Sequence, residues 1–235
     1  MLFRSNSSPA APLWNRNNSG ATYTLYSSST LNSAPGQPNG SSVLCLSCHD
    51  GTIALGNVIN PSTPITMATG TMPRGNLTTD LSNDHPVSFV FNAALAVADG
   101  QLLTPPLSTV KLDQSSRVQC TSCHDPHKDV YTKFLLASND NSALCLLCHD
   151  RNYWSASTHS TSTATWNGSG TDPWAHIENP FPTVARNACE NCHDPHNAAG
   201  NHRLLKSLQE ENVCLDCHNG NVASSAKDKI GRAHV

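Results

Sequence analysis

The sequence predicts a loop-rich fold with short helices and few strands, in which bound groups take the place of an ordinary apolar core. Three observations lead to this prediction. The 235-residue chain has few charged and aromatic residues, 13% and 6%, and it is rich in Ser, Thr, Asn, Gly and Pro. Its content of Leu, Ile, Val and Phe is low for a chain of this size to bury a stable core unaided. The third observation is the placement of its ten cysteines.

All ten cysteines fall in Cys-x-x-Cys-His motifs, so none remains for a disulfide or a nucleophile. This motif attaches c-type haem: the two thiols bond to the macrocycle, and the adjacent histidine binds the iron as proximal ligand. We therefore predict five covalently attached haem c groups and, as fold class, a multihaem cytochrome c packed around a chain of haems. The attachment cysteines are Cys45, Cys48, Cys120, Cys123, Cys145, Cys148, Cys189, Cys192, Cys214 and Cys217. The proximal histidines are His49, His124, His149, His193 and His218.

Structural zinc is the alternative interpretation, because paired Cys-x-x-Cys motifs also build zinc ribbons. A zinc site needs four ligands for each metal ion, and it does not require a histidine after every cysteine pair. Five such histidines in succession therefore favour haem over zinc.

The charge and hydropathy of the chain limit its partners. The formal net charge is −3, and haem propionates would make the assembled protein more acidic, which argues against nucleic acid as a partner. No apolar run approaches the roughly twenty residues that a membrane-spanning helix needs. We therefore expect no transmembrane segment in this sequence.

Four segments follow one another along the chain. Residues 6–119 hold a polar lead-in, the first motif and a long linker, residues 120–150 and 189–219 each hold two motifs, and residues 151–188 connect these two units. The patterns predict a short strand over 21–26, a loop over 27–42, a second short strand over 87–91 and a helix over 93–98. The motifs themselves are expected on short helical turns.

The two doubled units, 120–150 and 189–219, are copies of each other, as expected for a duplicated structural unit. Each opens with a leading motif, Cys-x-x-Cys-His-Asp-Pro-His, and closes with a trailing motif, Cys-Leu-x-Cys-His. The motif at Cys45 is of the trailing type and has no leading partner. A shift of 69 residues aligns the units without a gap and pairs Cys120 with Cys189, His127 with His196, Leu135-Leu136 with Leu204-Leu205, and Cys145 with Cys214.

Each iron needs a second, distal ligand, and five histidines outside the motifs are the candidates: His85, His127, His159, His176 and His196. His127 and His196 each follow a proximal histidine by three residues, with a proline between. So close a residue cannot readily reach the opposite face of its own haem, and we expect each to reach a neighbouring iron. His202 is a weaker candidate because its counterpart in the first unit is Lys133. Met67 and Met72 lie in no recognisable ligand context.

The two ends of the sequence resemble translated sequencing-adapter DNA. Leu2–Ser5 can be encoded by CTCTTCCGATCT, and Ile230–Val235 by ATCGGAAGAGCACACGTC, which begins with the reverse complement of the former. We expect residues 1–5 and 230–235 to be non-native and the chain to be a fragment of a longer protein. The signal peptide that haem attachment outside the cytoplasm requires would then have been lost by truncation.

The chain resembles bacterial multihaem c-type cytochromes with the doubled Cys-x-x-Cys-His motif. The resemblance rests on the leading motif, Leu-Leu and trailing motif of each unit, and it covers most of residues 11–220. It also rests on Pro12-Leu13-Trp14-Asn15, on Cys45-Leu46-Ser47-Cys48-His49-Asp50-Gly51-Thr52 and on Asn83-Asp84-His85-Pro86. Relatives often carry a leading motif before the Pro-Leu-Trp-Asn segment, and this sequence lacks one there.

The resemblance implies export, haems with two histidine ligands, and electron transfer in the periplasm or at the cell surface. The expected function is therefore electron transport in anaerobic or extracellular respiration, without a catalytic residue. The expected partners are redox proteins or extracellular electron acceptors, and assembly into a homopolymer is also compatible with the resemblance. The alternative is a multihaem oxyanion reductase, which would need one iron with an open distal face. The sequence contains no Cys-x-x-Cys-Lys variant, and the five predicted irons do not outnumber the distal candidates. Neither observation indicates an iron with an open distal face.

We expect the chain without haem to be largely unfolded, because its linkers bury little apolar surface by themselves. Circular dichroism of unhaemylated protein tests this prediction. A cooperative thermal transition in that sample would contradict it.

Overall fold

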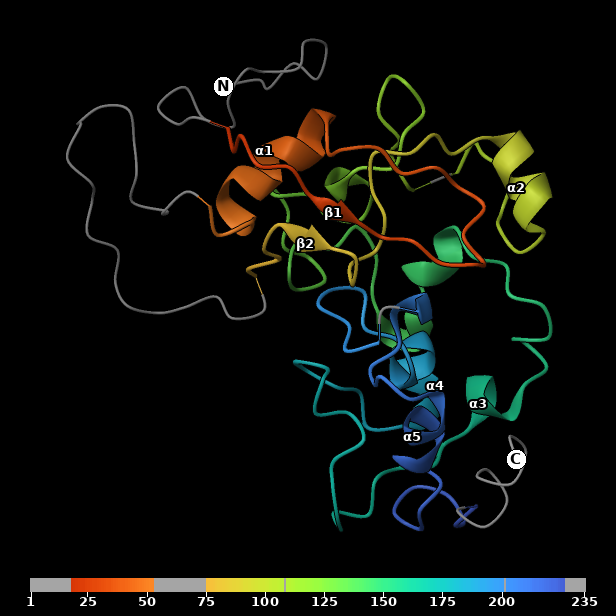
Figure 1. Ribbon diagram of the computed structural model, residues 1–235. Helices are drawn as coiled ribbons and strands as arrows, with labels where there is room; N and C mark the ends of the chain where they lie inside the picture. Colours follow the sequence, from red (N-terminus) through yellow and green to blue (C-terminus); the bar gives the residue numbers. More distant parts are fainter. Residues whose placement is uncertain (1–17, 53–74, 108, 201, 227–235) are drawn as a thin grey trace.

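The computed structural model describes residues 18–52, 75–107, 109–200 and 202–226, which form the loop-rich fold that the sequence predicts (Figure 1). The α-helices are α1 (Gly40–His49), α2 (Ala93–Asp99), α3 (Thr158–Thr161), α4 (Val184–Asn187) and α5 (Glu210–Leu215). Two strands, β1 (Thr24–Leu25) and β2 (Asp80–Leu81), pair in parallel. The 3₁₀ turns are η1 (Cys120–Ser122), η2 (Asp140–Ser142), η3 (Cys145–Leu147), η4 (Ala188–Asn191) and η5 (His202–Leu204). Figure 1 shows α1, α2 and the strands at one end of the molecule, and α3, α4 and α5 at the other. The suspected non-native ends and Pro12–Asn15 lie outside the described residues.

Every Cys-x-x-Cys-His motif lies on a helical turn, as predicted. In the last four motifs the N–H of the histidine donates to the carbonyl of the first cysteine, for example from His124 to Cys120 at 3.0 Å. Residues i, i+3 and i+4 of a helix share one face. The two thiols and the imidazole of a motif are thus presented together, which one flat macrocycle requires.

The remaining sequence predictions are confirmed in part. Strand β1 falls within 21–26, and α2 matches the predicted helix, with the Asn92 side chain capping its start and Gly100, at φ +73°, ending it. The expected strand over 87–91 is only a single bridge, from Val90 to Arg117. Ser88 has φ +62°, which interrupts the pleat. The loop predicted over 27–42 is shorter, because α1 already begins at Gly40.

In the described part of the chain, the apolar core consists of three small, separate clusters. The largest contains Phe89, Phe91, Ala96 and Val118. The second contains Tyr23, Leu46 and Leu81, and the third contains Tyr26, Ala198 and Leu204. This scattered burial agrees with a chain that does not build one continuous core of its own.

The buried side chain of Gln119 joins α1 to the first leading motif. Its amide oxygen accepts from Ser42 Oγ at 2.6 Å and from Ser88 Oγ at 3.2 Å. Its amide nitrogen donates to Asn39 Oδ1 at 2.8 Å and to Asp113 Oδ2 at 2.9 Å. The amide thus uses both donors and accepts two bonds, although the residue is only 1% exposed.

The hydrogen bonds of the two units correct the ungapped repeat. His124 forms a bridge with Leu135, whereas His193 forms one with Leu205, a spacing of 70 residues and not 69. In the same way Leu136 N–H donates to Cys123 O, and Lys206 N–H donates to Cys192 O, both at 2.9 Å. Compared with the first unit, the second unit therefore has one extra residue between its leading motif and Leu205. It has one fewer residue between Lys206 and its trailing motif. Lys206 is consequently the structural counterpart of Leu136.

Replacing Gln119 by Leu should lower the free energy of unfolding by about 1–3 kcal/mol, because buried partners lose their hydrogen bonds. Chemical denaturation of the matured protein measures this. The exposed Gln209, changed to Leu, is the matched control. A loss no larger than that of Gln209→Leu would contradict the role given to Gln119.

Candidate functional site

Three of the five motif histidines are oriented by backbone carbonyls. Their Nδ1 atoms lie 2.7–2.9 Å from a carbonyl oxygen: His49 at Gly75, His124 at Lys133 and His193 at Arg203. A carbonyl oxygen can only accept, so Nδ1 carries the proton and Nε2 keeps its lone pair. This is the tautomer that a metal-binding imidazole needs when Nε2 is the ligand atom.

Three motif histidines face a second histidine from a distant part of the chain. The ring centroids are 6.3 Å apart for His149 and His85, 6.3 Å for His124 and His196, and 6.2 Å for His218 and His159. The ring planes meet at 80°, 31° and 86°, respectively. The three partners are all distal candidates named from the sequence.

This spacing fits an ion held between two imidazoles. An imidazole nitrogen binds a metal at about 2 Å, so two rings on opposite sides of one ion have centroids roughly 6 Å apart. Within the described part of the chain, no three His, Cys, Asp or Glu side chains converge as a metal-ion cluster. Two facing imidazoles suit haem iron, because the macrocycle would supply the other ligands.

Segment 83–86 positions two of these pairs at once. It docks on the loop that follows the second leading motif: His85 N–H donates to Pro195 O, and Ala198 N–H donates to Asn83 O, both at 2.9 Å. His85 is thereby held opposite His149. Its neighbour Asp84 accepts from Nδ1 of His196 at 3.1 Å.

The electrostatics of the two docked histidines differ. Burial and, to a smaller extent, nearby His149 together lower the pKa of His85 to about 4, so the ring stays neutral at neutral pH. Burial also opposes protonation of His196, but the hydrogen bond and charge of Asp84 outweigh it and raise the pKa of His196. A neutral carbonyl, that of Pro86, accepts from His85 Nδ1 at 3.1 Å.

A serine links each trailing motif to the next leading motif. Ser42, three residues before Cys45, accepts from the N–H of Cys120 at 3.1 Å. Ser142, three residues before Cys145, does the same for Cys189 at 2.8 Å. These links place neighbouring attachment points side by side across the unit boundaries.

The thiols at these links contact each other. The hydrogen bond between Cys45 and Cys120 raises the pKa of the first and lowers that of the second to about 7. The bond between Cys145 and Cys189 likewise raises the pKa of Cys145 and lowers that of Cys189 to about 6.

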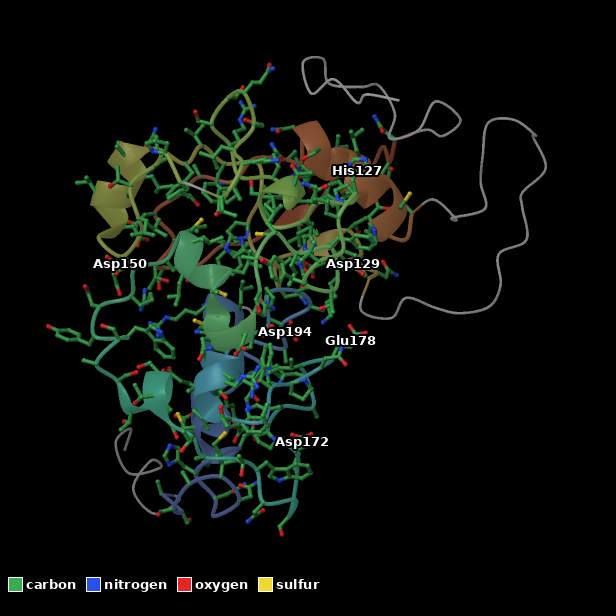
Figure 2. The ribbon with its side chains drawn as sticks, turned by 180° about the vertical axis from the view of Figure 1, so that it is seen from behind. His127, Asp129, Asp150, Asp172, Glu178 and Asp194 are labelled. Carbon is green, nitrogen blue, oxygen red and sulfur yellow. The ribbon has the colours of Figure 1, made fainter. Side chains whose placement is uncertain are left out.

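The other distal candidates take different positions. The ring of His127 is 70% exposed, with Nδ1 3.4 Å from Asp125 Oδ1. Figure 2 labels it together with acidic side chains spread along the molecule. His176 uses Nε2 to donate to Glu190 O at 2.7 Å, which leaves its lone pair on Nδ1. Within the described residues, no ring pair involves His49 or His193. Met67 and Met72 lie outside the described residues.

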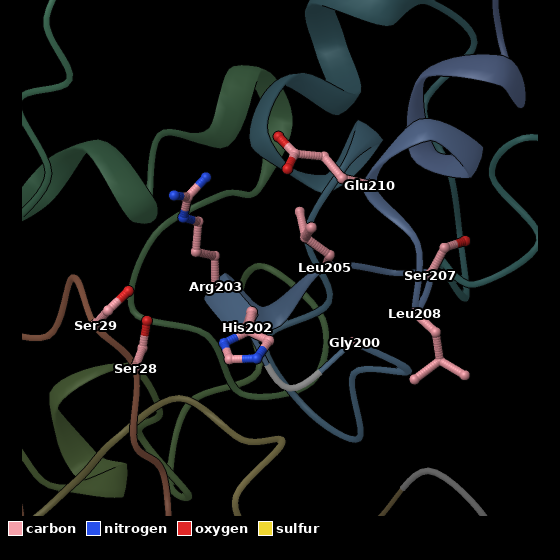
Figure 3. A pocket seen from close by; sticks show the side chains of 9 residues that line it. All are labelled: Ser28, Ser29, Gly200, His202, Arg203, Leu205, Ser207, Leu208 and Glu210. Atoms are coloured by element: carbon pink, nitrogen blue, oxygen red, sulfur yellow. The ribbon is translucent and has the colours of Figure 1, made fainter. Parts of the chain in front are cut away.

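His202 lines a surface pocket of about 550 Å³. Figure 3 shows it there with Arg203, Leu205 and Glu210. The Arg203 carbonyl accepts from His193, as described above, so the pocket adjoins this motif without containing its cysteines. The structural counterpart of His202 in the first unit is Thr132 and not Lys133, since the spacing here is 70 residues.

Comparison with known families supports the same chemistry. Residues 115–152 and 182–223 each match the family model of the doubled CXXCH motif. The chain is a multihaem c-type cytochrome with doubled CXXCH motifs. These motifs indicate covalently bound haem c and a role in electron transfer. No curated protein matches this cytochrome. None of its described helices has the length and apolar character that crossing a membrane requires.

Sequence reasoning missed the residues that arrange the motifs. Asp84 stands within Asn83–Pro86, and nothing in its local pattern indicates a contact with His196. Ser42 and Ser142 could have been found, because both stand three residues before the first cysteine of a trailing motif. The position holds Glu211 in the last trailing motif, so the signal is incomplete.

Proposed function

We propose that this cytochrome is an exported electron carrier with five covalently attached haem c groups, three of them ligated by two histidines from the described part of the chain. The observation that carries the proposal is the set of three histidine pairs. Because the two histidines of such a pair would both bind the same iron, that iron would have no position left for a substrate. The haem supplies a one-electron redox couple, and the chain's own residues hold and orient it.

The proposed ligand assignment follows a simple rule. Each trailing site takes its distal histidine from the linker ahead of its own unit: His85 serves the His149 site, and His159 serves the His218 site. The leading site at His124 takes His196 from the next leading motif. His127 remains a distal candidate for a neighbouring iron. His176 remains a distal candidate, but it would have to exchange its bond to Glu190.

The packing of the motifs supports transfer of electrons along the chain. The thiol contacts between Cys45 and Cys120, and between Cys145 and Cys189, bring successive attachment points together. Segment 83–86 connects the His149 site with the His124 site. The protein's task is then to hold its sites at short distances and to set their potentials.

The location and partners are part of the proposal. Haem c is attached outside the cytoplasm, which supports a place in the periplasm or at the cell surface. Redox proteins or extracellular electron acceptors would exchange electrons with it, in anaerobic or extracellular respiration. A homopolymer would extend the same chain of sites.

The alternative function, reduction of an oxyanion, is supported at one site. His193 has no ring partner within the described residues, and two cations act on it. Burial is the main cause that lowers the pKa of His193, and the charges of Arg151 and Arg203 lower it further. An iron there with an open face would have cationic donors nearby, as oxyanion binding needs.

Replacing His85, His159 or His196 by Ala should open one additional haem in each variant. Optical and EPR spectra of the matured protein, with and without carbon monoxide, measure this. Each variant should gain one high-spin haem that binds carbon monoxide when reduced. His202→Ala is the matched control and should leave the spectra unchanged.

An unchanged low-spin spectrum in these variants would contradict the ligand assignment. In the unaltered protein, a haem that binds carbon monoxide and is reoxidised by nitrite or another oxyanion would favour the reductase instead.

A further inference from the structure

Asp84 is a buried carboxylate that contacts a proposed iron ligand. Its side chain is 4% exposed. Oδ1 accepts from His196 Nδ1 at 3.1 Å and from the N–H of Asn197 at 3.2 Å. A carboxylate on the outer nitrogen of a metal-bound imidazole makes that ligand more basic. The corresponding nitrogen of His85 lies 3.1 Å from the neutral Pro86 carbonyl.

Lys206 is a buried cation in the second unit. Its side chain is 3% exposed, and Nζ lies 3.1 Å from Asp216 Oδ2. Nζ also donates to Pro173 O at 2.8 Å, and the backbone N–H donates to Cys192 O at 2.9 Å. Since Asp216 lies inside the trailing motif, Lys206 is tied to both motifs of this unit.

The first unit has no charge at these positions. The structural counterpart of Lys206 is Leu136, and the residue aligned with Asp216 in the trailing motif is Leu147. Two leucines in one copy thus correspond to an ion pair in the other. The ammonium group is almost fully buried, whereas the side chain of Asp216 is 35% exposed. Solvent therefore screens the carboxylate more than the ammonium, and the local field remains positive.

Buried charges shift redox equilibria in opposite directions. An oxidised iron site carries one more positive charge than a reduced one. A nearby carboxylate stabilises the oxidised form and lowers the potential, and a nearby ammonium stabilises the reduced form and raises it. Both groups lie where water cannot screen them fully.

We propose that Asp84 and Lys206 give this cytochrome a built-in direction of electron flow. Asp84 lowers the potential of the His124 site, and Lys206 raises the potentials of the sites at Cys189 and Cys214. Electrons then run from the first unit to the second. Each transfer oxidises one site as it reduces the next by one electron, with no bond made or broken. The inference rests on the proposed ligation of the His124 site by His196.

Redox titration of the matured protein, followed optically, tests the proposal. Asp84→Asn should shift the lowest-potential component upward while all haems stay low-spin. Lys206→Leu should shift the highest-potential components downward, and Leu should be accommodated because Leu136 occupies this place in the first unit. The control is Lys111→Leu, which removes an exposed lysine that precedes the first unit and should leave the potentials unchanged.

The double variant Lys206→Leu/Asp216→Leu recreates the first unit's leucine pair and removes the unpaired Asp216 carboxylate that Lys206→Leu alone would leave. It should still have lower high-potential components than the unaltered protein. Unchanged potentials in Asp84→Asn or Lys206→Leu, or shifts of opposite sign, would overturn the proposal. A new high-spin haem in Asp84→Asn would also overturn it, because Asp84 would then only hold His196 in place. Failure of the ligand assignment itself is seen separately, as a low-spin spectrum in His196→Ala.

Discussion

The docking of segment 83–86 on the loop after Cys192 is the contact on which the arrangement of the sites depends. Two backbone hydrogen bonds, from His85 to Pro195 and from Ala198 to Asn83, join parts of the chain more than a hundred residues apart. The contact turns His85 toward His149 and Asp84 toward His196. Closing so long a loop costs conformational entropy. Such a contact is therefore expected to form only when bound groups hold the surrounding turns in place.

Local structure was predictable from the sequence, because it depends on short-range rules. A Cys-x-x-Cys-His motif forms a helical turn wherever its three ligands must share a face, and all five motifs do so. The loop-rich character followed from a composition that cannot form a large core. The strand expected over 87–91 does not form because Ser88 adopts a positive φ. The apolar residues beside Ser88 give no indication of this backbone conformation.

The candidate site was predictable as a set of residues but not as a set of pairs. His85, His159 and His196 were all named as distal candidates, yet their partners depend on long-range docking that leaves no local signal. The repeat suggested equal roles for His127 and His196, but His196 faces His124, whereas the ring of His127 is 70% exposed and lies beside Asp125. The charge of Lys206 does not follow from the repeat, since Leu136 stands at the corresponding position of the first unit. Asp84 lies outside both units, so the repeat makes no prediction about it. Duplication thus fixed the attachment points, while later divergence altered the charges around them.

The central claim is that one iron lies between each histidine pair. Anomalous diffraction at the iron edge, from crystals of the matured protein, locates the irons directly. The account predicts an iron peak between His85 and His149, between His124 and His196, and between His159 and His218. Iron peaks beside the proximal histidines, with His85, His159 and His196 turned away from them, would contradict it.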